Sequence, residues 1–300
     1  MSWMIHAGLA YVIMAGSQLV DKAFLQVVFR DAKAYAALVG LLGSLAFILL
    51  PFGVTILPLP LLLVACLGGA LFIAAVWVFL SALQGDDASR IIPLLGSLIP
   101  LGTLFGETVF LGARFSATGY LAIGLLIVGA LTLTLTKSES PRRSNSAIML
   151  TIGAAALFAT SFVTTKYIYN QIDFVSGFFW MRMGGILFAV VLVGFSQTRA
   201  DLRHFFLTKS FPLKVGYFLN QAFAGGGFFL QSYAISLASV SLVTALQGIQ
   251  YVFVLLFIFI GSRIQPDLLG EKLTKRLLLE KLTSVALIAA GIALLAVARS

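Results

Sequence analysis

Charged residues are scarce in this chain of 300 residues. Asp, Glu, Lys and Arg make up 10% of it, whereas they form roughly a quarter of an ordinary soluble domain. Hydrophobic residues make up 60%, and a soluble fold of this size could not hide so much apolar surface and still cover itself with polar groups. The composition excludes a disordered chain, a disulfide scaffold and a basic nucleic-acid-binding fold. It indicates a protein whose solvent is lipid.

Cysteine and histidine are nearly absent. The single cysteine, Cys66, lies in an apolar run, which excludes an intramolecular disulfide and a thiolate metal site. His6 begins the first apolar run and His204 lies in a basic loop, so we expect an interfacial and a solvated side chain. The pair Asp86-Asp87 is expected to form a solvated loop with a helix cap rather than a metal or phosphate site. No catalytic motif is present, so we predict no enzyme, no cofactor and no metal.

Long apolar runs dominate the sequence. A membrane-spanning helix needs about 20 mostly apolar residues, and ten such runs occur, over 3–21, 34–51, 60–83, 90–111, 117–136, 147–168, 176–195, 212–237, 240–261 and 283–298. The first run lacks a small-residue cleavage site and is interpreted as a spanning helix. Strands of an outer-membrane barrel would show alternating polar and apolar residues over about ten positions, whereas these runs are continuous and about twice as long. We therefore predict an all-α membrane protein with ten transmembrane helices.

The net charge of +9 is distributed unevenly over the loops. Sixteen of the 20 Lys and Arg residues follow odd-numbered runs, while Arg114, Lys166 and Arg299 lie on the other side and Arg182 lies within a run. Positive loops stay in the cytoplasm, which predicts cytoplasmic odd loops and both termini outside. Residues 268–282 form an amphipathic stretch, either on the cytoplasmic leaflet or as an extension of the last helix.

The two halves of the chain share a pattern of residues. We divide it into a first five-helix unit, 1–136, a linker, 137–146, and a second unit, 147–300. The matches are Ala15, Ser17 and Lys22 with Ala159, Ser161 and Lys166, then Ala82, Ser89 and Gly96 with Ala234, Ser241 and Gly248, then Leu111 to Ser116 with Leu269 to Thr274, and Gly129 with Gly291. Because five is odd, the two units enter the membrane from opposite sides. Such inverted repeats are the usual framework of secondary transporters, with a site at the repeat interface.

The chain also resembles a known family. The segments GDDASRIIPLLGSLIPL, FLGARFS and LGEKLT, together with the ten runs and the paired halves, are similar to the EamA-domain proteins of the drug/metabolite transporter superfamily. The resemblance implies export of amino acids, other metabolites or drugs, or exchange of sugar conjugates. The family's Leu-Gly-Glu-Arg/Lys motif, which precedes the last helix of a half, is present in the second half at Glu271 and Lys272. In the first half, Ala113 occupies the acidic position. The resemblance implies cytoplasmic termini, and we follow the loop charges instead.

Four ionisable residues lie in or near the apolar runs, where charge is costly and indicates function. Glu107 is expected either to form a structural hydrogen bond or to titrate as a coupling site. Arg182 either bonds backbone carbonyls or attracts an anionic substrate group. Lys22 and Lys166 occupy matching positions in the two halves, and both either extend to the interface or take part in the site.

Uncharged polar residues follow consistent faces of two late runs. Asn220 and Gln231 lie about 20° apart on a helix, with small residues, Ala224 and Gly227, between them. Gln247, Gln250 and Tyr251 share a face by their spacing. Amides in a bundle either join helices or line a cavity. We predict that these five polar residues line a central cavity, with Gln18 and Trp77 on its opposite wall.

These patterns predict a secondary active transporter that exports a small polar metabolite, such as an amino acid, by alternating access. It would be a multi-pass protein of the cytoplasmic (inner) membrane, a monomer or homodimer, with the bilayer and a small-molecule substrate as partners and no nucleic acid. Coupling to an ion, to a substrate gradient, or to neither is left open. The alternatives are a flippase or exchanger of a phosphorylated or lipid-linked sugar, and a structural membrane subunit without transport activity.

Overall fold

A computed structural model of the chain describes residues 2–29, 31–86, 88–135, 144–264, 283–284, 286–292 and 294. All regular secondary structure in these ranges is helical. Six helices are long and apolar enough to cross a membrane, over Ser2–Gln26, Ala32–Phe52, Leu59–Gly85, Arg90–Phe110, Asn145–Tyr169 and Phe174–Val193. The predicted class, an all-α integral membrane protein, is confirmed.

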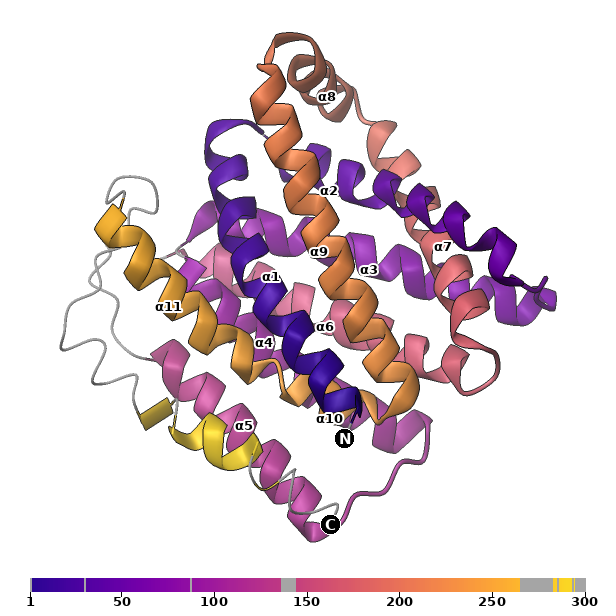
Figure 1. Ribbon diagram of the computed structural model, residues 1–300, viewed down its shortest axis with the longest axis vertical. Helices are drawn as coiled ribbons and strands as arrows, with labels where there is room; N and C mark the ends of the chain where they lie inside the picture. The colour runs from indigo at the N-terminus through magenta and orange to yellow at the C-terminus, as the bar shows by residue number, and fades with distance from the viewer. Residues whose placement is uncertain are drawn as a thin grey trace.

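The helices follow the apolar runs closely. They are α1 (Ser2–Val27), α2 (Ala32–Leu41), the 3-10 helix η1 (Leu42–Phe52), α3 (Leu59–Gly85), α4 (Ala88–Phe110), α5 (Ala117–Leu135), α6 (Asn145–Tyr169), α7 (Phe174–Val193), α8 (Ser196–Thr208), α9 (Phe211–Leu237), α10 (Val240–Ala245) and α11 (Gly248–Ile264) (Figure 1). The last run is described only in part, over 283–284, 286–292 and 294. Three predicted features lie outside the described residues: positions 137–143 of the linker, the amphipathic stretch 268–282, and the motif at Glu271 and Lys272.

Three local features differ from the predicted runs. The second run tightens into a 3-10 helix from Leu42 onward. The run expected to be continuous over 240–261 is interrupted at Leu246 and Gln247, between α10 and α11. The basic loop after α7 forms α8, because buried Phe205 anchors it against Phe29, 5.0 Å away between ring centroids, at one end of the bundle.

Glycines allow α3 and α7 to cross with their backbones in contact. A Cβ atom at Gly69 would lie 1.7 Å from the carbonyl oxygen of Met181, and one at Gly184 would lie 2.0 Å from that of Cys66. Small residues at a crossing let membrane helices approach closely. The other main contacts join α1 to α9, α3 and α4 to α6, and α2 to α7.

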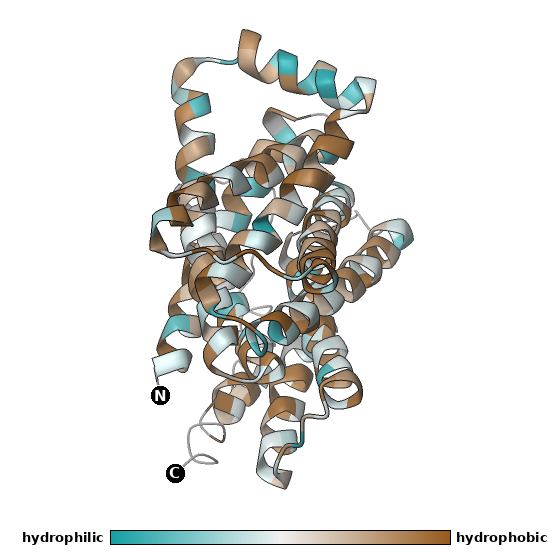
Figure 2. Ribbon diagram, turned by 90° about the vertical axis from the view of Figure 1, so that its right-hand side faces the viewer, coloured by the Kyte–Doolittle hydropathy of each residue, from teal (hydrophilic) through white to brown (hydrophobic). Residues whose placement is uncertain are grey.

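The outer surface of the bundle is apolar. Ile5, Phe110 and Phe211 are 70%, 74% and 78% exposed, and brown residues cover most helices in Figure 2, with α8 at the top as the polar exception. Polar side chains such as Glu107, Gln231 and Gln250 are buried instead. This inside-out distribution suits a lipid environment, in which polar groups must find partners within the bundle.

Candidate functional site

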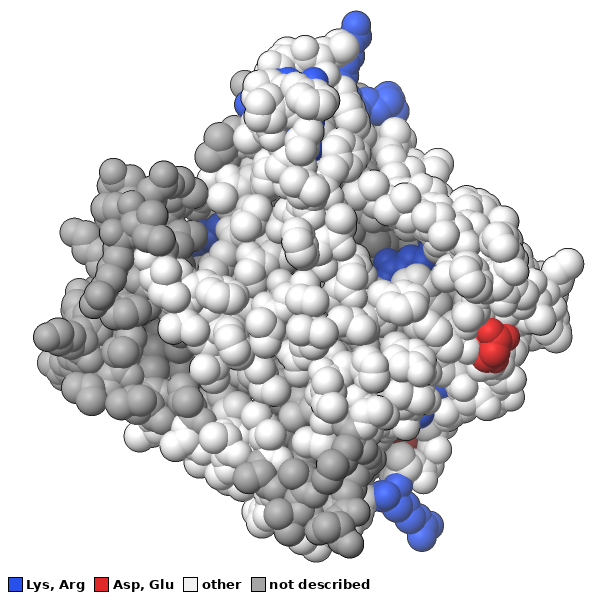
Figure 3. Space-filling view, viewed as in Figure 1, with Lys and Arg blue, Asp and Glu red and all other residues white. Residues whose placement is uncertain are grey.

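A cavity of about 720 Å³ lies among α1, α2, η1, α3, α4, α6, α7, α9 and the break between α10 and α11. Eight phenylalanines line it, and its polar lining is Ser17, Gln18, Asp21, Tyr35, Arg182, Gln221, Gln231 and Gln247. Figure 3 shows basic atoms within a hollow between α9 and α7 on an otherwise largely uncharged face. The cavity is therefore a mainly apolar space, rich in phenylalanine, that holds one carboxylate and one guanidinium.

The carboxylate belongs to Asp21, near the end of α1. Its Oδ1 accepts hydrogen bonds from Asn220 Nδ2 at 2.6 Å, from Gln221 Nε2 at 3.2 Å and from the Tyr35 hydroxyl. Gln221 also donates to Tyr35 Oη at 2.8 Å. No hydrogen-bond donor meets Oδ2 in the described part of the chain. The neutral donors thus hold one oxygen of a carboxylate whose residue lines the cavity, and the second oxygen is left without a donor from the described residues.

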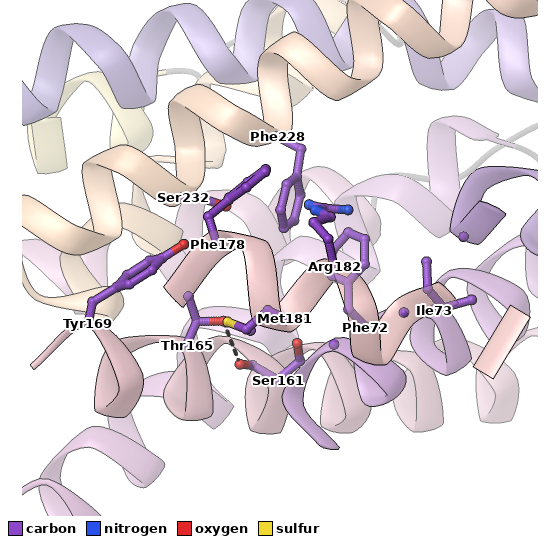
Figure 4. Close-up of a pocket in the computed structure, with 13 residues that line it drawn as sticks. Phe72, Ile73, Ser161, Thr165, Tyr169, Phe178, Met181, Arg182, Phe228 and Ser232 are labelled. Atoms are coloured by element: carbon purple, nitrogen blue, oxygen red, sulfur yellow. Dashed lines mark hydrogen bonds between the residues drawn. The ribbon is translucent and has the colours of Figure 1, made fainter. Parts of the chain in front are cut away.

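The guanidinium belongs to Arg182, in the middle of α7. Its Cζ lies 3.9 Å from the ring centroid of Phe228, 4.8 Å from that of Phe178 and 5.5 Å from that of Phe72 (Figure 4). Rings stabilise a cation through their negative faces but use none of its five N–H donors. Within the described ranges, Arg182 has no carboxylate partner. The donors are thus available to an anionic group of a ligand.

A smaller pocket adjoins Arg182 and is lined by hydroxyl groups. Ser161, Thr165, Tyr169 and Ser232 contribute to it. The first two are already engaged, because Ser161 Oγ donates to Gly68 O at 2.8 Å and Thr165 Oγ1 donates to Ser161 O at 2.8 Å. This pocket holds about 20 Å³, enough for a water molecule but not for a metabolite.

The amides gather at the break between α10 and α11. Gln250 Nε2 donates to Gln18 Oε1 at 2.5 Å, and Gln231 Nε2 donates to the Tyr11 hydroxyl at 3.1 Å, which donates to Val243 O at 2.9 Å. Gln247 lines the cavity, and its buried Oε1 has no partner among the described residues. An unpaired amide oxygen in a membrane costs energy unless water or a ligand meets it.

The predicted cavity residues occupy three kinds of position: in the cavity lining, next to a lining residue to which they bond, and away from the cavity. Gln18, Arg182, Gln231 and Gln247 line the cavity. Asn220 and Gln250 do not line it, but bond Asp21 and Gln18, which do. Of the three adjacent glycines, Gly227 packs against Ala10 O of α1, whereas Gly225 and Gly226 face the cavity.

Two predicted wall residues, Trp77 and Tyr251, lie outside the lining of this cavity. Trp77 packs against the hydrophobic core, with Lys33 Nζ 5.6 Å from its ring centroid. Tyr251 is fully buried, and its hydroxyl occupies the space that a Cβ atom at Gly96 would take. Both side chains contribute packing between helices, because their neighbours in α4, α2 and the core fill the volume around them.

Asp21, Tyr35 and Gln221 were missed in the sequence analysis. Asp21 is the last residue of the first predicted run, 3–21, whereas α1 continues to Val27 and places Asp21 within the helix. The signal that could have found it is the adjacent pair Asn220 and Gln221, because two amides one residue apart in a membrane helix need polar partners on more than one face.

The three possible coupling or charge residues, Glu107, Lys22 and Lys166, form hydrogen bonds with groups at the ends of other helices. Glu107 is 3% exposed and accepts from Ser239 Oγ at 2.7 Å, Val240 N at 3.2 Å, Ser241 N at 2.9 Å and Ser241 Oγ at 2.5 Å. Lys22 Nζ donates to Asp86 O and Lys166 Nζ to Ile235 O, each at 3.1 Å. None of the three lines the cavity, and Lys22 is buried within the bundle.

The acidic pair in the loop after α3 is described only at Asp86. Its Oδ2 lies 2.8 Å from Arg90 Nη1 and accepts weakly from Ser144 N at 3.5 Å. Asp87 lies outside the described residues. Over the described ranges, no group of three or more His, Cys, Asp or Glu side chains is placed to hold a metal ion.

Comparison with known proteins identifies the fold but no activity. No protein-family profile matches the chain, and no curated protein matches it. Among 26 matching chains of solved structures, one described only as the crystal structure of a protein has a TM-score of 0.67 and 15% identity, over 99% of this chain and 96% of the other. At this identity the likeness shows that the whole chain adopts a fold already observed experimentally.

Proposed function

We propose that the protein is a secondary active transporter that moves a small polar metabolite, such as an amino acid, across the cytoplasmic membrane by alternating access. The observation that carries this proposal is the cavity of about 720 Å³ with Asp21 and Arg182 on its walls. Charges within a membrane bundle are costly and mark ion or substrate pathways. A guanidinium held only by aromatic rings gains most from a ligand that brings an anionic group.

We propose further that the chain is built as two inverted five-helix repeats and belongs with the EamA-domain transporters. Pairs of packed helices support the repeat. In the proposed repeat, α1 corresponds to α6, α3 to α9 and α4 to α11. The contact of α1 with α9 then has its counterpart in the contact of α6 with α3, and the contact of α4 with α6 has its counterpart in that of α11 with α1; all four contacts occur. Lys22 and Lys166 match in the two halves. Lys22 donates to a carbonyl oxygen at the end of α3, and Lys166 donates to one near the end of α9.

The break at Gln247 also supports transport. Transporter sites near the midplane are typically formed by discontinuous helices, whose unwound segments expose polar groups to the cavity. Here the interruption between α10 and α11 places Gln247 in the cavity wall. A structural subunit would gain nothing from a cavity lined by an unpaired amide and two charges. A doubly charged phosphate would suit this cavity poorly, because Asp21 would repel it.

Counterflow in proteoliposomes tests the proposal. Purified protein is reconstituted with one unlabelled candidate inside, an amino acid, an ω-amino carboxylate or a short peptide, and uptake of the same labelled compound is followed. We expect saturable counterflow for at least one, reduced at least tenfold by Arg182→Gln and reduced by Gln247→Leu, because each loses a polar group of the wall. Gln197→Leu, on exposed α8, is the matched control and should transport normally. Folded protein that exchanges no metabolite would refute transport.

A further inference from the structure

We infer that the cavity binds an elongated amphipathic zwitterion: an ammonium group at Asp21, an apolar body along the phenylalanines and a carboxylate at Arg182. The inference rests on the proposed function and sharpens it by naming the charge layout of the substrate. Three features of the cavity carry it, namely the unused donor and acceptor groups, the distance between them, and the lining that separates them.

The two charged groups have complementary vacancies. Asp21 offers Oδ2, which accepts no hydrogen bond from the described residues, while three neutral donors hold Oδ1. An ammonium group supplies donors and a positive charge for such an oxygen. Arg182 offers a planar set of N–H donors that matches a carboxylate. Neither residue forms an ion pair with the other or with another described side chain.

The spacing of two contact residues along helix α9 indicates how far apart the carboxylate and the guanidinium lie. Gln221 bonds Asp21, and Phe228 stacks on Arg182. These residues are seven apart on one face of α9, which corresponds to roughly 10 Å along the helix axis at about 1.5 Å per residue. Asp21 and Arg182 also approach from different helices, α1 and α7. An α-amino acid, whose ammonium and carboxylate share one carbon atom, cannot reach both.

The lining between the charges is apolar and aromatic. Phe72, Phe158, Phe162 and Phe218 face the cavity, and Gly225 and Gly226 leave space where side chains would otherwise intrude. An alkyl chain or the side chains of a short apolar peptide would bury their surface here. Two or three extended residues span about 7–11 Å, which matches the separation of the charges.

Thermal stabilisation of the purified protein by defined probes tests this inference. The probes are the ω-amino carboxylate aminooctanoate, its singly charged relatives octanoate and octylammonium, the α-amino acid leucine, and the peptides leucyl-leucine and leucyl-leucyl-leucine. We expect aminooctanoate or one of the peptides to bind about tenfold to a hundredfold more tightly than either singly charged probe and than leucine. The better of the two classes then identifies the substrate type.

Variants assign each end. Asp21→Asn should abolish the advantage of aminooctanoate over octanoate, and Arg182→Gln its advantage over octylammonium. Asp31→Asn and Arg203→Gln, outside the cavity, should leave both advantages unchanged. If a variant fails to fold, the comparison of the probes on the wild-type protein decides by itself. Equal binding of doubly and singly charged probes, or tighter binding of leucine, overturns the inference. Counterflow of a different metabolite would then still support transport.

Discussion

Two carboxylates within the helix bundle have opposite surroundings. Glu107, with Ser239, Val240 and Ser241, forms what we call the closed carboxylate region, where four hydrogen bonds occupy both oxygens. Asp21, with Tyr35, Asn220 and Gln221, forms the open carboxylate region, where Oδ1 is held and Oδ2 accepts no hydrogen bond from the described residues. A carboxylate inside a membrane bundle can therefore be fully paired, as Glu107 is, or keep an acceptor oxygen that a ligand could use, as Asp21 does.

The closed region should be the more sensitive to loss of its carboxylate. Glu107→Ala leaves the backbone N–H groups of Val240 and Ser241 unpaired inside the bundle, and each unpaired group costs about 1–3 kcal/mol. We expect the free energy of unfolding to fall by roughly 3 kcal/mol, seen as a lower melting temperature in detergent. Glu107→Gln, which keeps acceptor oxygen, should lose less. An unchanged melting temperature for Glu107→Ala would show that the region is not structural.

The same contrast of closed and open surroundings applies to glycines. At Gly184 an added Cβ would lie 2.0 Å from Cys66 O, whereas at Gly226 nothing lies within 4 Å. Gly184→Ala should therefore destabilise the bundle by about 1–3 kcal/mol through overpacking. Gly226→Ala should leave stability unchanged or raise it by up to about 1 kcal/mol. Parallel melting curves check the pair, and equal losses would contradict the assigned crossing of α3 and α7.

The smallest expected effect on stability is at Asp21. Asp21→Asn keeps an oxygen that accepts from Asn220, Gln221 and Tyr35, and removes a charge that no cation balances. We expect the free energy of unfolding to change by less than about 1 kcal/mol, while counterflow falls at least tenfold. Stability is measured by thermal melting and transport in the same preparation. Loss of folding with Asp21→Asn would place Asp21 in the same structural category as Glu107.

The sequence was sufficient to predict an all-α membrane protein because a bilayer imposes a simple requirement: continuous apolar runs of about 20 residues. It was less sufficient for the cavity. Gln231 and Gln247 were predicted because amides are rare in such runs and must face inward. Trp77 was misplaced because α3 is apolar on every side, so no periodicity shows which face meets the cavity.

Other features of the site depend on contacts between distant segments. Tyr251 fills the space over Gly96, a relation between α11 and α4 that spacing along the chain does not reveal. The break at Leu246 and Gln247 has no proline to announce it. Asp21 was lost at a helix boundary, where sequence patterns are least precise, and its partners on α9 were needed to place it inside the bundle.

Labelling of a single cysteine placed in the cavity tests alternating access through this cavity. Cys66→Ala removes the native thiol, Gly226→Cys places a new one on the cavity wall, and Ser196→Cys on exposed α8 is the control. A membrane-impermeant thiol reagent is added from either side of sealed vesicles. Alternating access predicts that the cavity cysteine is labelled from both sides and that aminooctanoate or leucyl-leucine slows this, while the α8 cysteine is labelled from one side and is unaffected. Labelling of the cavity cysteine from one side only, with no protection by any probe, would contradict the account.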